Sequence, residues 1–107
     1  MGQTRIAVVS TDGVNVDEHF GKAKRFLIYE LDDHMHLVEE RLTETLSVGD
    51  RGHAFDPTKF QRISSLLKDC ARVYVSQIGD VPAAKLRELG LETVIYKGPI
   101  GKIVEKE

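Results

Sequence analysis

The stretch RVYVSQIGDVPAAKLRELGLETVIY, residues 72–96, contains the clearest signal of the fold. It begins with a short apolar run, 72–78, and ends with a second one, 91–96. Short apolar runs of this kind are typical of strands buried on both faces of a sheet. Between them, Pro82 marks the first turn of a helix and Gly90 its end. Strand, helix and strand in this order predict a right-handed βαβ unit with parallel strands.

The N-terminal part of the chain supplies three more strands. RIAVVS, residues 5–10, is as apolar as 72–78, so we expect these two strands to lie side by side and parallel in the middle of the sheet. Residues 24–32 and 36–44 form the two arms of a predicted β-hairpin around a turn rich in aspartate. The second arm is heavily charged, which suits an edge strand.

A further helix is predicted over about 57–69, where Asp56-Pro57 is a start signal. One apolar stripe runs along it, made of Phe60, Ile63, Leu66, Leu67 and Cys70. Because Cys70 continues this stripe, we interpret it as a buried, inert thiol rather than a nucleophile.

Together these elements predict an α/β fold in one domain, residues 1–107, with its core at about 5–104. The sheet is mixed and five-stranded, with an antiparallel hairpin on one side, a parallel βαβ unit on the other and helices covering its faces. This connectivity is compatible with a ribonuclease-H-like arrangement.

Composition excludes several classes of protein. The net charge of −2 argues against general nucleic-acid binding, which usually shows a basic excess. No apolar stretch approaches the ~20 residues of a membrane span, and the N-terminus has no signal-peptide core. The single cysteine rules out an internal disulfide framework and a four-thiolate metal site within one chain. We therefore expect a cytoplasmic protein.

The segment DEHFG, residues 17–21, combines chemical features that are unusual for a loop. His19 can donate a nitrogen to a transition metal, and Gly21 lets a bulky ligand approach the backbone. The cations that follow could neutralise an anionic ligand; they are Lys22, Lys24 and Arg25. On spacing alone, a plain surface loop ahead of a strand remains the favoured interpretation.

The other histidines carry weaker signals. His34 and His36 flank the predicted hairpin turn, where solvated side chains are the ordinary case. His53 lies in a glycine-containing loop that would let it reach a metal, and its plain interpretation is again a surface residue.

Known enzyme templates do not match this sequence. A two-metal nuclease holds its cations with carboxylates on the central strands, and neither 5–10 nor 72–78 contains one. Asp12 and Asp80 follow these strands, where each has a structural role as a turn or cap residue. Walker-type phosphate loops and GxSxG elbows are absent from the sequence. A divalent-metal hydrolase is therefore a weak hypothesis, and we expect a protein that is not an enzyme.

Two long segments resemble one known family. VSTDGVNVDEHFGKAKRFLIYELDD, residues 9–33, is similar to the signature of the dinitrogenase iron–molybdenum cofactor biosynthesis family, which includes NifX- and NafY-type proteins and the C-terminal domain of NifB. LLKDCARVYVSQIGDVPAAKLRELGLETV, residues 66–94, resembles the same family, with its D-C pair, its strand leading to I-G and its helix ending in a leucine–glycine pair. One departure is Val81, where NifB-type domains often carry cysteine.

The resemblance implies a ribonuclease-H-like fold without nuclease activity that binds or carries an anionic metal–sulfur cluster. The cluster would be the iron–molybdenum cofactor or a precursor, or a molybdenum–copper sulfide cluster as in the related orange protein type. It implies His19 as the favoured metal contact and cofactor-assembly proteins or a recipient apo-enzyme as partners. The expected binding segment comprises His19, Phe20, Gly21, Lys22, Lys24 and Arg25, with Phe20 mainly anchoring the loop. The alternative is a protein-interaction or regulatory module on the same fold without its own cluster.

Overall fold

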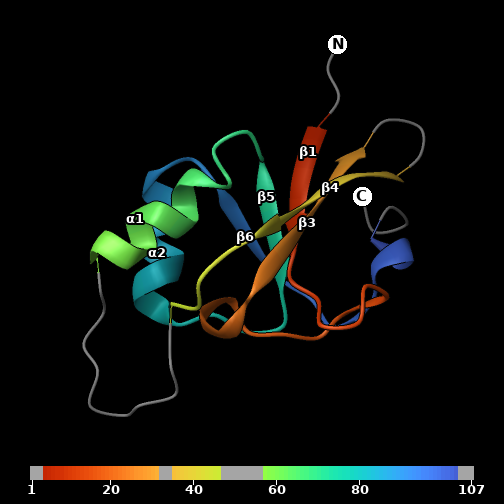
Figure 1. The fold of residues 1–107 in the computed structure, drawn as a ribbon, viewed down its shortest axis with the longest axis horizontal. Helices are drawn as coiled ribbons and strands as arrows, with labels where there is room; N and C mark the ends of the chain where they lie inside the picture. The colour runs from red at the N-terminus through yellow and green to blue at the C-terminus, as the bar shows by residue number, and fades with distance from the viewer. Residues whose placement is uncertain (1–3, 32–34, 47–56, 104–107) are drawn as a thin grey trace.

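The computed structural model describes residues 4–31, 35–46 and 57–103. Its centre is a five-stranded sheet in the order β4-β3-β1-β5-β6 (Figure 1). The strands are β1 (Thr4–Val8), β3 (Arg25–Leu31), β4 (Met35–Leu42), β5 (Arg72–Val75) and β6 (Glu92–Ile95). β1, β5 and β6 are mutually parallel, whereas β3 is antiparallel to β1 and β4 is antiparallel to β3. The predicted mixed sheet, its hairpin and its central parallel pair are confirmed.

Buried side chains on both faces explain why β1 and β5 occupy the middle of the sheet. Ile6 and Val8 of β1 join Tyr74 of β5 in one apolar cluster. Ala7 of β1 joins Val73 of β5 in a second cluster on the opposite face, since alternate residues of a strand point to opposite sides. β4 lies at the edge, and its middle residues are exposed.

The helices are placed differently from the prediction. α1 (Pro57–Ser65) and α2 (Asp80–Glu88) both cover the same face of the sheet, where Phe60, Ile63 and Leu86 are buried (Figure 1). The opposite face is covered by the short elements β2 (Asn15–Val16), β7 (Gly98–Pro99) and η2 (Ile100–Lys102). Val16 and Ile100 from these segments, and Ile103 directly after η2, are buried in this smaller cluster.

The predicted helix over 57–69 ends earlier, at Ser65. Tighter turns follow it, in which the amides of Leu66 and Leu67 donate to the carbonyls of Ile63 and Ser64 at 3.0 and 2.9 Å. Leu67 and Cys70 are nevertheless buried. The apolar stripe therefore predicted burial correctly, while the helix itself is shorter.

Gly90 ends α2 as predicted. Its φ of +85° lies in the left-handed region that favours glycine. The amide of Leu91 donates to the carbonyl of Leu86, and the amide of Gly90 donates to the carbonyl of Arg87, both at 3.0 Å. This pair of bonds is a Schellman motif, which turns the chain directly into β6. At the other end of α2, Gly79 is the cap residue and Asp80 is the first helical residue.

None of the helices in the described residues has the length and apolar character that crossing a membrane requires.

Candidate functional site

One edge of the sheet gathers polar groups around the carboxyl ends of the parallel strands. Ser10 and Ser76 follow β1 and β5, and they are the two buried polar residues of the described chain, with exposed fractions of 4% and 7%. Ligands of open α/β sheets usually bind at this edge. The segment that carries DEHFG crosses the same edge.

Backbone hydrogen bonds fix the position of His19. The amide of Ser76 donates to the carbonyl of Glu18 at 3.1 Å, and the amide of Phe20 donates to the carbonyl of Gln77 at 2.9 Å. These two bonds form a parallel bridge between His19 and Gln77 just beyond the end of β5. The half-buried imidazole of His19 is therefore carried on backbone that is held on both sides.

Phe20 anchors this segment to the hydrophobic core. Its side chain is 1% exposed and packs against Phe26 and Phe60, with ring centroids 6.0 and 6.4 Å apart. This packing agrees with the expected anchoring role of Phe20, while its inclusion in the binding segment stays a prediction.

The two carboxylates beside His19 accept hydrogen bonds from residues of their own loop. Asp17 accepts hydrogen bonds from the amide of Thr11 at 2.8 Å and from its hydroxyl at 2.7 Å. Glu18 accepts one from the amide of His19 at 2.9 Å. These acidic groups therefore shape the loop.

Asp12 shapes the start of the loop in the same way. Its Oδ1 accepts hydrogen bonds from the amides of Val14 and Asn15, at 2.8 and 2.9 Å. These donors favour the ionised carboxylate, so they hold the pKa of Asp12 well below its usual range. Because its Oδ1 accepts hydrogen bonds from backbone amides of the same turn, Asp12 has the structural role in a turn that the sequence predicts.

Two separate hollows flank the DEHFG segment. The first, which we call the His19 hollow, has a volume of about 420 Å³ and is lined by Asn15, Val16, Asp17, His19, Ser76, Lys97 and Gly98. The second, the Lys22 hollow, has a volume of about 330 Å³ and is lined by Val9, Ser10, Thr11, Glu18, Lys22, Ala23, Lys24, Arg25 and Leu42. The structure thus separates the predicted metal contact from the predicted cations. Gly21 lines neither hollow.

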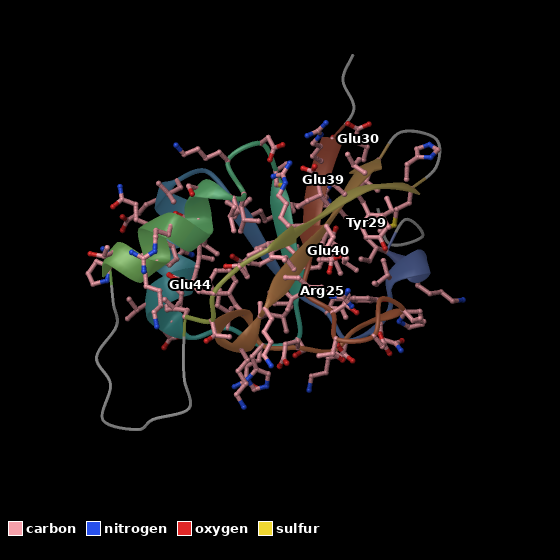
Figure 2. All side chains as sticks on the ribbon, in the orientation of Figure 1. Arg25, Tyr29, Glu30, Glu39, Glu40 and Glu44 are labelled. Carbon is pink, nitrogen blue, oxygen red and sulfur yellow. The ribbon has the colours of Figure 1, made fainter. Side chains whose placement is uncertain are left out.

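Arg25 is engaged by neighbouring groups. Its Nη1 lies 2.9 Å from Oε2 of Glu40 on the adjacent strand β4, and its Nη2 donates to the carbonyl of Thr11 at 3.2 Å. Figure 2 labels Arg25 and Glu40 on these neighbouring strands. Lys22 and Lys24 are exposed, and neither takes part in an ion pair with another described residue. Of the three cations that follow His19 in the sequence, Arg25 is thus the one that pairs with a described carboxylate.

Lys97 is the residue at this site that sequence reasoning missed. It follows β6 at the carboxyl edge and lines the His19 hollow. No motif surrounds it in the sequence. The one signal that could have found it is its place directly after the last parallel strand.

His19 has no partners among the described residues for a metal site with three or more protein ligands. Among the described residues, no group of three or more histidine, cysteine, aspartate or glutamate side chains is arranged to hold a metal ion. Cys70 precedes β5, at the opposite end of that strand, and its thiol is 8% exposed. Burial raises the pKa of the Cys70 thiol to about 12, so it remains protonated at neutral pH. His53 lies outside the described residues.

Similarity to known proteins extends over nearly the whole chain. The family model described as dinitrogenase iron–molybdenum cofactor matches residues 2–106. The FeMo cofactor biosynthesis protein NifB of Chlorobaculum tepidum is 34% identical over 103 residues, which cover 92% of this chain and 22% of that protein. Protein NifY of Azotobacter vinelandii is 33% identical over 104 residues, which cover 95% of this chain and 40% of that protein. The chain thus spans about a fifth of NifB and two fifths of NifY.

Solved structures share the fold. The crystal structure of PH0822 has a TM-score of 0.65 at 20% identity and covers 95% of this chain and 87% of that one. An NMR structure described as that of a NifB protein from Thermotoga has a TM-score of 0.61 at 22% identity, with 95% and 84% covered. The family model matched over residues 2–106, together with the NifB and NifY relatives, leads to one conclusion: the chain belongs to the dinitrogenase iron–molybdenum cofactor family, which takes part in FeMo-cofactor biosynthesis.

Proposed function

We propose that this protein binds and carries an anionic metal–sulfur cluster, the iron–molybdenum cofactor or one of its precursors, without chemically changing it. A molybdenum–copper sulfide cluster is a second candidate cargo. The observation that carries the proposal is the placement of His19. Its imidazole borders a hollow at the carboxyl edge of the sheet, on backbone that Ser76 and Gln77 hold through hydrogen bonds on both sides.

The donor set favours a preassembled cluster over a bare metal ion. A bare zinc or iron ion takes several protein ligands, usually histidine, cysteine or carboxylate. Here His19 is one nitrogen donor, and its neighbours Asp17 and Glu18 accept hydrogen bonds within the loop. A cluster brings its own sulfide ligands, so one imidazole can complete the coordination of an exposed metal. The same shortage of free carboxylates disfavours a divalent-metal hydrolase.

Lys22 and Lys24 support the proposal through their longer-range charge. The protein as a whole carries a net charge of −2, so an anion is attracted only by a local excess of cations. Both lysines are exposed beside the DEHFG segment. We propose that they increase the rate at which an anionic cluster reaches the site, and that Arg25 contributes mainly to the structure of the loop.

The proposal has three further parts. The strand order β4-β3-β1-β5-β6, with three antiparallel neighbours followed by two parallel additions, supports a ribonuclease-H-like classification. Cofactor-assembly proteins or a recipient apo-enzyme are the proposed partners, in keeping with the family. The reducing cytoplasm is the proposed compartment, which suits a protein with a single free thiol.

Anaerobic titration with isolated iron–molybdenum cofactor, followed by visible absorption, tests the proposal. His19→Ala should bind at least about tenfold more weakly than wild type, because a metal–nitrogen bond is lost. His36→Ala is the matched control, since His36 is exposed on β4 and pairs with Glu30 at the opposite end of the sheet. Equal affinity of wild type and His19→Ala would remove His19 from the site. A wild-type chain that binds no cluster would favour the interaction-module alternative.

A further inference from the structure

Resting on the cluster binding proposed above, we infer that the cargo sits between segment 15–19 and the turn at 96–99, with Lys97 as its contacting cation. This assignment differs from the one expected from the DEHFG motif, in which the cations that follow His19 surround the cluster. Lys97 borders the same hollow as His19, whereas the cations that follow His19 in the sequence border the Lys22 hollow.

A small two-stranded ladder brings Lys97 to His19. β2 and β7 pair antiparallel, with Asn15 opposite Pro99 and Val16 opposite Gly98. The amide of Ile100 extends the contact by donating to the carbonyl of Val14 at 2.8 Å. The side chains of Val16 and Ile100 are buried beneath the ladder. This packing positions the last segment of the chain as one wall of the His19 hollow.

The turn that carries Lys97 has a defined shape. Gly98 has a φ of +136°, which side-chain-bearing residues rarely adopt. The hydroxyl of Tyr96 donates to the carbonyl of Pro99 at 2.7 Å and closes the turn. The backbone of Lys97, between Tyr96 and Gly98, is therefore held in place while its side chain remains exposed.

The charges that line the hollow explain why Lys97 matters for binding an anion. One lysine, Lys97, and one carboxylate, Asp17, line the His19 hollow. Hydrogen bonds from Thr11 hold the carboxylate of Asp17 in position. None of the ion pairs within the described chain involves Lys97. With Lys97 present, its positive charge offsets Asp17 and can face an anion. Without Lys97, the remaining carboxylate would repel one.

Ser76 adds a polar residue to the lining of the hollow. It is 7% exposed and follows β5 directly, and it lines the same hollow as His19. A hydroxyl can donate a hydrogen bond to a sulfide or an oxygen of the cargo. Three different segments therefore contribute to the hollow. They offer the cargo a metal ligand in His19, a positive charge in Lys97 and a hydrogen-bond donor in Ser76.

Tetrathiomolybdate, a dianionic molybdenum–sulfur compound, is the probe for this inference. Its binding is followed anaerobically by visible absorption at equilibrium and by stopped-flow mixing. Lys97→Gln should weaken binding by roughly tenfold, mainly through faster dissociation, because a contacting charge is lost. Lys97→Arg should restore most of the affinity, since it keeps the charge. Lys22→Gln should instead slow association, and its effect should fade as salt is added.

The outcomes separate this inference from the proposed function. If His19→Ala binds isolated iron–molybdenum cofactor more weakly than wild type while Lys97→Gln binds tetrathiomolybdate like wild type, the function stands and the assignment of Lys97 is overturned. If wild type binds no tetrathiomolybdate, the inference fails, and the titration with isolated iron–molybdenum cofactor still decides the proposed function. Urea unfolding of each variant confirms that the change in affinity does not arise from a loss of folding.

Discussion

Arg41 of β4 holds the carboxylate of Asp69 through two parallel hydrogen bonds, Nη1 to Oδ1 at 2.8 Å and Nη2 to Oδ2 at 2.9 Å. Nη1 of Arg41 also donates to the carbonyl of Leu66 at 2.6 Å, and Nη1 of Arg5 donates to Asp69 at 2.7 Å. Forked, charge-assisted bonds of this kind are stronger than neutral ones. They connect the edge strand β4 and the central strand β1 with the turns that follow α1.

The first prediction concerns acid stability. Arg41 holds the pKa of Asp69 well below its usual range, so the folded protein keeps this carboxylate ionised at a pH where the unfolded chain takes up a proton. The resulting stabilisation is present above the unfolded pKa of about 4 and is lost as the pH falls through the lower folded pKa. Asp69→Asn should therefore flatten the dependence of the urea midpoint on pH between about 5 and 2.

Glu88→Gln is the control for this experiment, because Glu88 is exposed on α2 and forms no ion pair within the described residues. It should leave the pH profile close to that of wild type. An Asp69→Asn profile as steep as that of wild type would show that other carboxylates determine the acid response.

The second prediction separates ligand contact from loop anchoring at adjacent positions. His19→Ala should change the free energy of unfolding by less than ~0.5 kcal/mol, because the half-buried imidazole adds little to the core. Phe20→Ala should cost about 3–5 kcal/mol, since it empties space between Phe26 and Phe60. Urea unfolding measures both. A His19→Ala variant as unstable as Phe20→Ala would assign the imidazole a structural role.

The third prediction concerns Cys70. Its thiol should react slowly with a thiol reagent at pH 8 and quickly after unfolding, because burial keeps it protonated and covered. Its raised pKa, about 12, also means that the folded state retains a proton that the unfolded chain loses above about pH 9. Stability should thus decline as the pH rises from about 9 toward 12, and Cys70→Ala should weaken that decline. Rapid labelling of the native protein would contradict this picture.

The fourth prediction concerns local stability. Amide hydrogen exchange should be slowest in β1 and β5, which lie in the middle of the sheet with side chains buried on both faces. β4 should exchange faster, because it is an edge strand whose middle residues are exposed. Protection concentrated in β4, with fast exchange in β1, would contradict the strand order.

Much of the fold could be predicted because its signals are local. The apolar runs at 5–10 and 72–78 require cover on both faces, so they indicate central strands before any contact is known. Gly90 ends α2 because its left-handed conformation suits glycine, which is also a local property. The sequence likewise singled out DEHFG, since the residue types in that segment are unusual together.

Tertiary structure decided which of these residues meet. Lys97 borders the same hollow as His19 because β2 and β7 pair across most of the length of the chain, and two-residue strands have no recognisable pattern of their own. Lys22 is only three positions from His19, yet the turn of η1 (Phe20–Lys22) places it at a different hollow. Local patterns in the sequence were sufficient to predict the main strands, the end of α2 and the candidate ligand His19. The composition of the site depended on how sheet edge, loop and C-terminal segment pack together, because contacts between distant segments are set by the whole fold and leave no local signal.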